Sequence, residues 1–339
     1  MVVNRSIGPV NKIVKGTPIE GLPSLILGGA TLNTQYNDDP ESIPLTEMIR
    51  YAFERGIRAI DTSPYYGESE SLYGRALEHL RAEYPRDTYF ICSKVGRIRL
   101  DEFDYSRSSV RKSVLRSCER LKTDYIDVIF LHDVEFVDSK QILEALKELR
   151  ALKNGGIIHN FGISGYPVKF LLSIALQSLK IAEIGPLDAV LSYANLNLQN
   201  TILEDEFEHF KNEARVKVVE NGSILSMSLL RAQKTLQFHP CSTELRERAE
   251  KAAQYAAAQG KDLATLATKY ALSRWVDRGP TVLGVSSVSE LEIALQSYWD
   301  VIDRVGHDLS ASDSEDVAHI QGTILGEHLN ETWKSGIEH

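Results

Sequence analysis

The chain reads Ile57-Arg58-Ala59-Ile60-Asp61-Thr62-Ser63-Pro64-Tyr65-Tyr66-Gly67 at the point that decides its fold. The apolar residues before the Asp are typical of a short buried strand, and the strand ends on a carboxylate. Lys94 and His132 each follow a later apolar run in the same way. Polar groups that end successive buried strands indicate a parallel sheet whose strand ends share one rim.

Short runs rich in Ile, Val and Leu recur along the whole chain. We expect eight of them to be strands: Leu25–Leu27, Ile57–Ile60, Tyr89–Ser93, Ile126–Leu131, Ile157–Ile163, Asp188–Ser192, Val216–Val219 and Pro280–Gly284. Between strands, Ser106–Leu121 and Ser139–Leu152 carry their apolar residues on one helical face. This alternation predicts the α/β class and favours a (β/α)8 TIM barrel over an open sheet. We expect a single domain over residues 1–339, with the barrel core at about 24–304 and a C-terminal extension at about 305–339.

Composition narrows the possible partners and the compartment. The formal net charge of −9 argues against nucleic acid or an anionic membrane as the main partner. Cys92, Cys118 and Cys241 are widely spaced, as expected of reduced thiols in a cytoplasmic protein. No Cys or His pair has metal-ligand spacing, and Met1–Val10 lacks the apolar core of a signal peptide. We therefore expect a cytoplasmic protein without a metal, an obligate protein partner or a membrane anchor.

The polar groups at the strand ends could act together in one proton-transfer reaction. A free phenol such as that of Tyr66 titrates near 10, and a nearby ammonium such as that of Lys94 favours the phenolate. Asp61 would hold the Lys94 side chain in place, and the His132 imidazole would bond to a substrate oxygen. This set predicts proton transfer to or from a carbonyl or hydroxyl oxygen.

Two other oxidoreductase architectures lack their sequence signatures here. Gly28-Gly29 follows the first strand without the G-x-G-x-x-G spacing of a dinucleotide-binding Rossmann unit. None of the tyrosines is followed by Lys at the Tyr-x-x-x-Lys spacing of short-chain dehydrogenases. Both alternatives are excluded.

At these residues the chain resembles the aldo-keto reductase superfamily over most of its length. The family's Asp-x-x-x-x-Tyr-Gly signature stands as Asp61 to Gly67. The resemblance implies that Tyr66 is the general acid/base, Lys94 its activator, Asp61 the partner of Lys94, and His132 the group that orients the substrate oxygen. The continuation 132–136 looks most like the branch of D-arabinose 1-dehydrogenase and L-galactose dehydrogenase.

The resemblance also implies a nicotinamide cofactor. Ser164 matches the family's contact to the nicotinamide amide, whereas Gly165 stands where Asn is usual. Ser192 or Asn195 replaces the usual Gln. Residues 223–230, with Ser223 and Leu225, resemble the segment that lies along the pyrophosphate.

The segment 283–290 is expected to set the choice between NAD and NADP. It supplies Gly284, Ser286 and Glu290, and in relatives that prefer NADP it carries a Lys and an Arg. A carboxylate in place of cations repels the 2′-phosphate of NADP and suits the ribose hydroxyls of NAD. We therefore expect NAD to be the preferred cofactor.

The resulting expectation is an NAD-dependent aldose 1-dehydrogenase that oxidises a sugar such as D-arabinose to its lactone. Asn33, Tyr65, Arg97 and Glu135 are candidate contacts to the sugar hydroxyls. One alternative is an aldehyde or ketone reductase that uses the same four catalytic residues in the reverse direction. A second alternative is a regulatory β-subunit of a potassium channel, a role also found in this superfamily, which assembly into a tetramer would favour.

Overall fold

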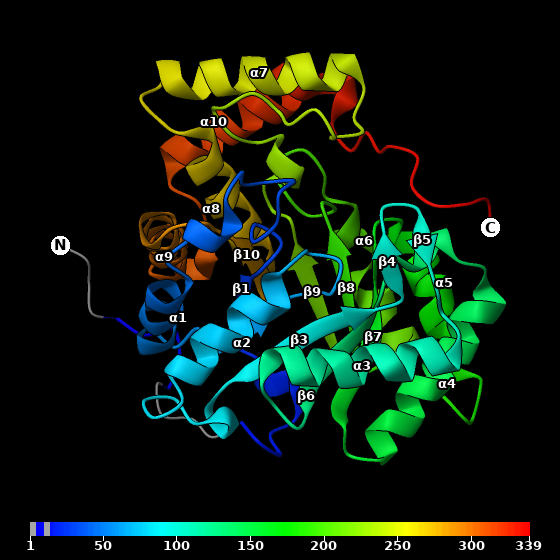
Figure 1. Cartoon of the computed structure of the whole chain (residues 1–339). Helices are drawn as coiled ribbons and strands as arrows, with labels where there is room; N and C mark the ends of the chain where they lie inside the picture. The colour runs from blue at the N-terminus through cyan, green and yellow to red at the C-terminus, as the bar shows by residue number, and fades with distance from the viewer. Residues whose placement is uncertain (1–4, 10–13) are drawn as a thin grey trace.

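The computed structural model describes residues 5–9 and 14–339 and shows a closed barrel of parallel strands (Figure 1). The strand order around the barrel is β1-β10-β9-β8-β7-β6-β3-β2. Much of the Met1–Val10 segment considered for a signal peptide lies outside the described residues. The (β/α)8 fold expected from the sequence is confirmed.

Within the described residues, all eight expected barrel strands are present, with ends that differ by a few residues from the sequence pattern. They are β1 (Leu25–Gly28), β2 (Ala59–Asp61), β3 (Phe90–Val95), β6 (Ile126–His132), β7 (Ile158–Gly165), β8 (Ala189–Tyr193), β9 (Val218–Gly222) and β10 (Thr281–Gly284). Asp61 and His132 are the last residues of β2 and β6, and Lys94 is the second-last residue of β3, so all three lie within the strands rather than after them. The strand pairing therefore fixes the backbone from which each of these side chains projects.

Helices surround the barrel, and the chain returns through them from each strand to the next (Figure 1). The surrounding helices are α1 (Leu45–Glu54), α2 (Ser69–His79), α3 (Arg107–Leu121), α4 (Ser139–Asn154), α5 (Val168–Leu179), α6 (Ile202–Glu208), α8 (Leu263–Trp275) and α9 (Val288–Ile302). The two predicted helices are confirmed as α3 and α4. Ser106 caps α3 by accepting a hydrogen bond from the backbone N–H of Ser109.

Two further helices, α7 (Thr243–Ala258) and α10 (Ala311–His319), lie together beyond one side of the ring (Figure 1). With α8 and the turn Ile320–Leu325 they enclose a second apolar cluster that includes Leu245, Leu266 and Ile320. From this layer the last residues of the chain run to the side of the barrel that carries α5, where the C-terminus lies (Figure 1).

The barrel has two apolar layers because its strands are buried on both faces. One set of side chains fills the interior of the barrel, and it includes Ile26, Phe90, Phe130, Leu191 and Val218. The alternate residues of the same strands pack outward against the helices. Successive side chains of a barrel strand point alternately into and out of the barrel. Lys94 and His132 therefore lie on the inner face, nearer the strand C-termini than these interior apolar side chains.

A short antiparallel hairpin follows β3 and was not expected from the sequence. Its strands are β4 (Arg97–Arg99) and β5 (Glu102–Phe103). Phe103 stacks on Phe136, with ring centroids 5.0 Å apart, which fixes the hairpin against the loop after β6. Within residues 5–9 and 14–339, none of the helices is both long and apolar enough to span a membrane.

Candidate active site

Lys94 and Asp61 form a buried ion pair at the ends of two adjacent strands. The ammonium Nζ lies 2.6 and 2.8 Å from the two carboxylate oxygens and 3.0 Å from the carbonyl oxygen of Thr62. Burial alone would lower the pKa of Lys94, but the Asp61 carboxylate and the Tyr66 phenol raise it above its ordinary value. Lys94 is therefore a permanent cation within the barrel mouth.

Tyr66 lies directly beside this cation. The Lys94 ammonium is 4.9 Å from the centroid of the Tyr66 ring. Burial raises the pKa of the Tyr66 phenol to about 12, although Lys94 acts to lower it, while Asp61 and Asp133 add to the increase. The sequence argument gave the direction of the Lys94 effect correctly but did not include the larger cost of burying a phenolate.

His132 completes the cluster from the end of β6. Its ring lies edge-on to that of Tyr66, with centroids 5.6 Å apart, and its Nδ1 is 3.0 Å from the hydroxyl oxygen of Ser63. Burial, followed by the neighbouring Lys94 and Arg97, lowers the pKa of His132 well below its ordinary value. The imidazole is therefore neutral at physiological pH.

The sequence reasoning missed one charged group beside this histidine. Asp133 has a left-handed backbone (φ 56°) and forms an ion pair with Arg97. The Arg97 guanidinium also lies 4.0 Å from the centroid of the Tyr65 ring, and the Tyr65 ring lies edge-on to His132. The structure thus brings the predicted Arg97 and Tyr65 to the same side of the barrel mouth as His132. Asp133 lies close to both Arg97 and His132. A polar residue directly after the strand-end His was the available sequence signal.

Two other predicted sugar contacts are used differently. Glu135 is fully buried and its carboxylate accepts hydrogen bonds from Tyr166 N and Ser335 Oγ, each at 3.0 Å. The backbone oxygen of Glu135 accepts from Ile337 N and His339 Nε2. Glu135 therefore anchors the C-terminal segment, while its second carboxylate oxygen, Oε2, has no hydrogen-bond partner among the described residues, and its contact with a sugar stays a prediction.

The Asn33 side chain is likewise engaged by its own loop. Its amide nitrogen donates to Ala30 O at 2.7 Å, and its amide oxygen accepts from Gln35 N at 2.6 Å. Both polar groups of Asn33 thus shape the turn after β1, and its contact with a sugar hydroxyl stays a prediction.

The predicted nicotinamide contacts lie on neighbouring strands. Ser164, near the end of β7, donates only a long hydrogen bond of 3.3 Å to Leu131 O. On β8, Ser192 Oγ accepts from the Asn195 amide at 2.9 Å, and the same amide nitrogen donates to Tyr166 O. Asn195 is thereby locked into the loop after β8, so the two candidates for the missing Gln contact form one hydrogen-bonded unit.

The segment predicted to lie along a pyrophosphate has an unusual backbone. Ser223, Ser226, Met227 and Ser228 all have positive φ angles. Ser223 Oγ accepts from Met227 N at 2.9 Å, which ties the turn that contains Leu225. The hydroxyl of Ser226 is buried without a partner among the described residues. A tightly wound loop with an unused hydroxyl fits an oxygen-rich group such as a diphosphate.

Gly284 ends β10, and Ser286 and Glu290 lie at the start of α9. The motif Ser287-Val288-Ser289-Glu290 forms a cap, because Ser287 Oγ accepts from Glu290 N at 3.2 Å and the Glu290 carboxylate accepts from Ser286 N at 2.7 Å. Glu290 therefore has a structural role in addition to its charge. The serine hydroxyls and the helix N-terminus fit the ribose and phosphate groups of a dinucleotide.

Another buried carboxyl lies inside the barrel, from β9, and no sequence signal pointed to it. Glu220 is fully buried, and neither of its oxygens has a hydrogen-bond partner among the described residues. Burial, with a further contribution from Asp61, raises the pKa of Glu220 to about 8, although Lys94 acts to lower it. Glu220 is thus a carboxyl kept neutral at pH 7 beneath the Lys94–Asp61 pair.

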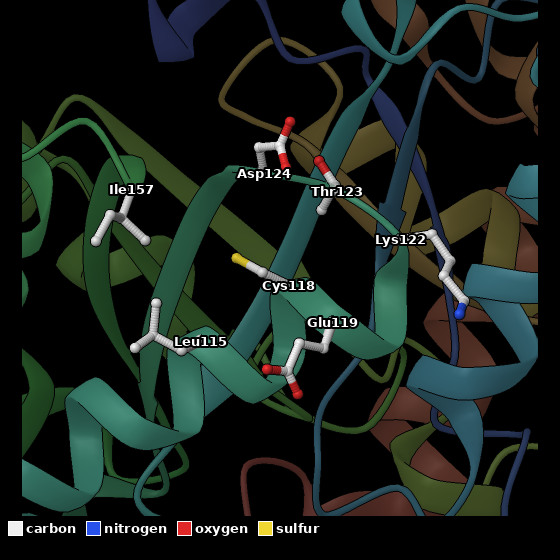
Figure 2. Close-up of a pocket in the computed structure, with 7 residues that line it drawn as sticks. All are labelled: Leu115, Cys118, Glu119, Lys122, Thr123, Asp124 and Ile157. Atoms are coloured by element: carbon white, nitrogen blue, oxygen red, sulfur yellow. The ribbon is translucent and has the colours of Figure 1, made fainter.

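A hollow on the opposite rim of the barrel carries no comparable chemistry (Figure 2). It is formed by the end of α3, the turn into β6 and Ile157, with Cys118 and Glu119 among its lining residues. Burial raises the pKa of the Cys118 thiol to about 11, so that thiol stays protonated and unreactive at neutral pH.

Comparison with known proteins agrees with this geometry. The Aldo/keto reductase family matches residues 24–304. The chain is 59% identical to D-arabinose 1-dehydrogenase of Saccharomyces cerevisiae over 331 residues, which cover 97% of this chain and 98% of that protein. It is 34% identical to L-galactose dehydrogenase of Arabidopsis thaliana over 292 residues, covering 85% of this chain and 86% of that protein.

Solved structures share the same fold at lower identity. A glycerol dehydrogenase from Gluconobacter oxydans matches with a TM-score of 0.63 at 21% identity, over 94% of this chain and 96% of that one. A holo aldo-keto reductase from Bacillus halodurans matches with a TM-score of 0.65 at 21% identity, over 90% and 94% of the two chains.

The barrel, its rim and these matches define a nicotinamide-dependent oxidoreductase. The chain belongs to the aldo-keto reductase family, and the resemblance expected from the sequence is confirmed.

Proposed function

We propose that this protein is an NAD-dependent aldose 1-dehydrogenase that oxidises D-arabinose, or a closely similar sugar, to the aldono-lactone. The observation that carries this proposal is the convergence of Asp61, Lys94, Tyr66 and His132 at one end of the barrel. The near full-length likeness to a D-arabinose 1-dehydrogenase supports the choice of an aldose.

The four residues have distinct roles in this proposal. Tyr66 removes the proton of the anomeric hydroxyl, and Lys94 stabilises the phenolate that takes it. Asp61 holds the Lys94 ammonium through two short contacts, at 2.6 and 2.8 Å. His132, as a neutral imidazole, donates a hydrogen bond to the sugar oxygen. A nicotinamide bound at this rim would supply the acceptor for the hydride of the anomeric carbon.

Tyr65 and Arg97 are the best placed of the predicted sugar contacts. Arg97 lies over the Tyr65 ring, which lies edge-on to His132, and Tyr65 is half-buried. We propose that they contact sugar hydroxyls beyond the anomeric carbon. Because Arg97 is already paired with Asp133, it acts there as a directional hydrogen-bond donor rather than as a free charge.

The cofactor choice rests on charge at the start of α9. We propose that Ser164 and Ser192 face the nicotinamide side, Ser223 and Leu225 the diphosphate, and Gly284, Ser286 and Glu290 the adenosine ribose. Glu290 places a carboxylate where NADP would place a phosphate, so NAD is favoured.

A reductase of aldehydes is the second candidate, and one observation favours it. Since burial raises the pKa of Tyr66 to about 12, the phenol is protonated at neutral pH and is ready to donate rather than accept a proton. Reduction should therefore gain at neutral pH and oxidation at alkaline pH.

The test is a panel of pentoses, hexoses and simple aldehydes, assayed with NAD and NADP in both directions while the absorbance of reduced nicotinamide is followed. The proposal expects D-arabinose with NAD to give the highest kcat/KM, and a lactone product that hydroxylamine traps. Turnover of aldehydes with no oxidation of any aldose would replace it with the reductase assignment.

A further inference from the structure

Ser63 lies in the loop after β2, two residues beyond Asp61, and its side chain is fully buried. Its hydroxyl is 3.0 Å from Nδ1 of His132, a residue 69 positions away. We propose that Ser63 is a positioning residue that fixes the tautomer of His132, so that Nε2 carries the proton presented to the substrate oxygen. This inference rests on the role proposed above for His132.

The Ser63 hydroxyl has one hydrogen to donate and is in contact with two nitrogen atoms. The hydroxyl oxygen already accepts the backbone N–H of Tyr65 at 3.1 Å. If Nδ1 of His132 were protonated it would donate to the same oxygen, and the hydroxyl hydrogen would then need another acceptor. The structure shows no second acceptor for this hydroxyl in residues 5–9 and 14–339. A buried donor without an acceptor is unfavourable, so the hydroxyl donates to an unprotonated Nδ1.

The other ring nitrogen of His132, Nε2, has a negatively charged neighbour. Nε2 of His132 lies 3.7 Å from a carboxylate oxygen of Asp133, which Arg97 holds in place. A lone pair on Nε2 would face this negative oxygen and be repelled, whereas an N–H in that position is attracted. Ser63 and Asp133, which lie on opposite sides of the imidazole, thus favour the same tautomer.

The tautomer decides which residue takes the substrate proton. With hydrogen on Nε2, the neutral ring donates to the sugar oxygen and leaves Tyr66 as the only base in contact with the hydroxyl hydrogen. With hydrogen on Nδ1, the ring would offer a lone pair that competes with Tyr66 and repels the carbonyl oxygen of the product. Ser63 therefore directs the proton from the anomeric hydroxyl to Tyr66.

The direct test is 15N NMR of the full chain labelled at histidine, with the His132 signals assigned by their loss in His132→Gln. We expect Nδ1 to show the shift of an unprotonated nitrogen and Nε2 that of a protonated one. In Ser63→Ala, a substantial fraction of His132 should carry its hydrogen on Nδ1. An Nδ1-protonated ring in the wild type, or an unchanged tautomer in Ser63→Ala, would overturn the inference.

Ser69→Ala is the matched control. Ser69 is equally buried, and its hydroxyl bonds to Thr62 Oγ1 at 2.8 Å and to Gly29 O at 3.1 Å without contact to His132. Its loss should leave the His132 tautomer unchanged, and a change there would show that any buried cavity perturbs the ring. If Ser63→Ala does not fold, the wild-type spectrum alone still decides the tautomer.

Kinetics give a second readout. In Ser63→Ala, kcat/KM for D-arabinose oxidation with NAD should fall by about tenfold or more, and Ser63→Thr, which keeps a hydroxyl, should recover most of it. Equal rates in wild type and Ser63→Ala would contradict the inference. Absence of any aldose oxidation by the wild type would instead overturn the proposed function, while the tautomer measurement would stand.

Discussion

Replacing Lys94 by Met removes the cation that lies 4.9 Å from the centre of the Tyr66 ring. At an effective dielectric constant of about 20, two unit charges at this separation interact by about 3.4 kcal/mol. That energy corresponds to about 2.5 pKa units, so the pKa of Tyr66 should rise further above the value of about 12 that burial already gives it. At every pH below that pKa, a smaller fraction of the enzyme then holds the phenolate.

The expected result is a fall of about a hundredfold or more in kcat/KM for aldose oxidation at fixed pH. The pH at which oxidation reaches half its maximum should also move upward. The assay follows reduced nicotinamide over neutral and alkaline pH with protiated and C1-deuterated sugar, so that the isotope effect shows whether hydride transfer limits the rate.

A double variant separates the electrostatic effect from structural damage, because Lys94→Met alone leaves the Asp61 carboxylate buried without its cation. Lys94→Met with Asp61→Asn removes that stranded charge, and Asp61 itself raises the pKa of Tyr66. The upward shift of the pH profile should therefore be smaller in the double variant than in the single variant, but still present. An unchanged pH–rate profile with a full isotope effect would refute the coupling of Lys94 to Tyr66.

Three further outcomes are expected. Tyr66→Phe should lower kcat by about a hundredfold or more. The control Tyr65→Phe should change mainly the KM for the sugar. A kcat near that of wild type in Tyr66→Phe would show that Tyr66 is not the general acid/base. The kcat/KM of the wild type with NAD should be at least about tenfold higher than with NADP. Glu290→Arg should narrow or invert this ratio of kcat/KM values, and the effect should be smaller at high salt. A wild-type preference for NADP would contradict the role given to the Glu290 charge. Glu220→Gln should raise the midpoint of thermal unfolding more at pH 8 than at pH 5. A folded-state pKa of about 8 means that wild type loses stability as pH rises from the unfolded-state pKa toward 8, and the Gln variant does not. An equal gain at both pH values would show that the pKa of Glu220 is not raised by folding.

The sequence was a good guide to the barrel because its strands are buried on both faces and are therefore mostly apolar. That requirement is local, so β6 and β7 could be found from a few consecutive residues. The same reasoning located Asp61, Lys94 and His132, since a polar side chain that follows such a run lies at the strand end. The hairpin β4–β5 was missed because its strands are only three and two residues long, and its apolar residues Ile98 and Leu100 are exposed rather than part of a buried run.

Only the tertiary structure decided how the side chains of the site are used. Glu135 contacts Ser335, 200 residues later in the chain, and Ser63, after β2, meets His132 of β6 across the intervening strand β3. The raised pKa of Tyr66 likewise depends on how completely its neighbours exclude water. The sequence by itself thus determined the barrel and the residue types on its rim, because burial of a strand is a local demand. Which rim residues touch one another, carry a proton or hold the C-terminal segment depends on loops packed against distant parts of the chain, and no local pattern encodes that packing.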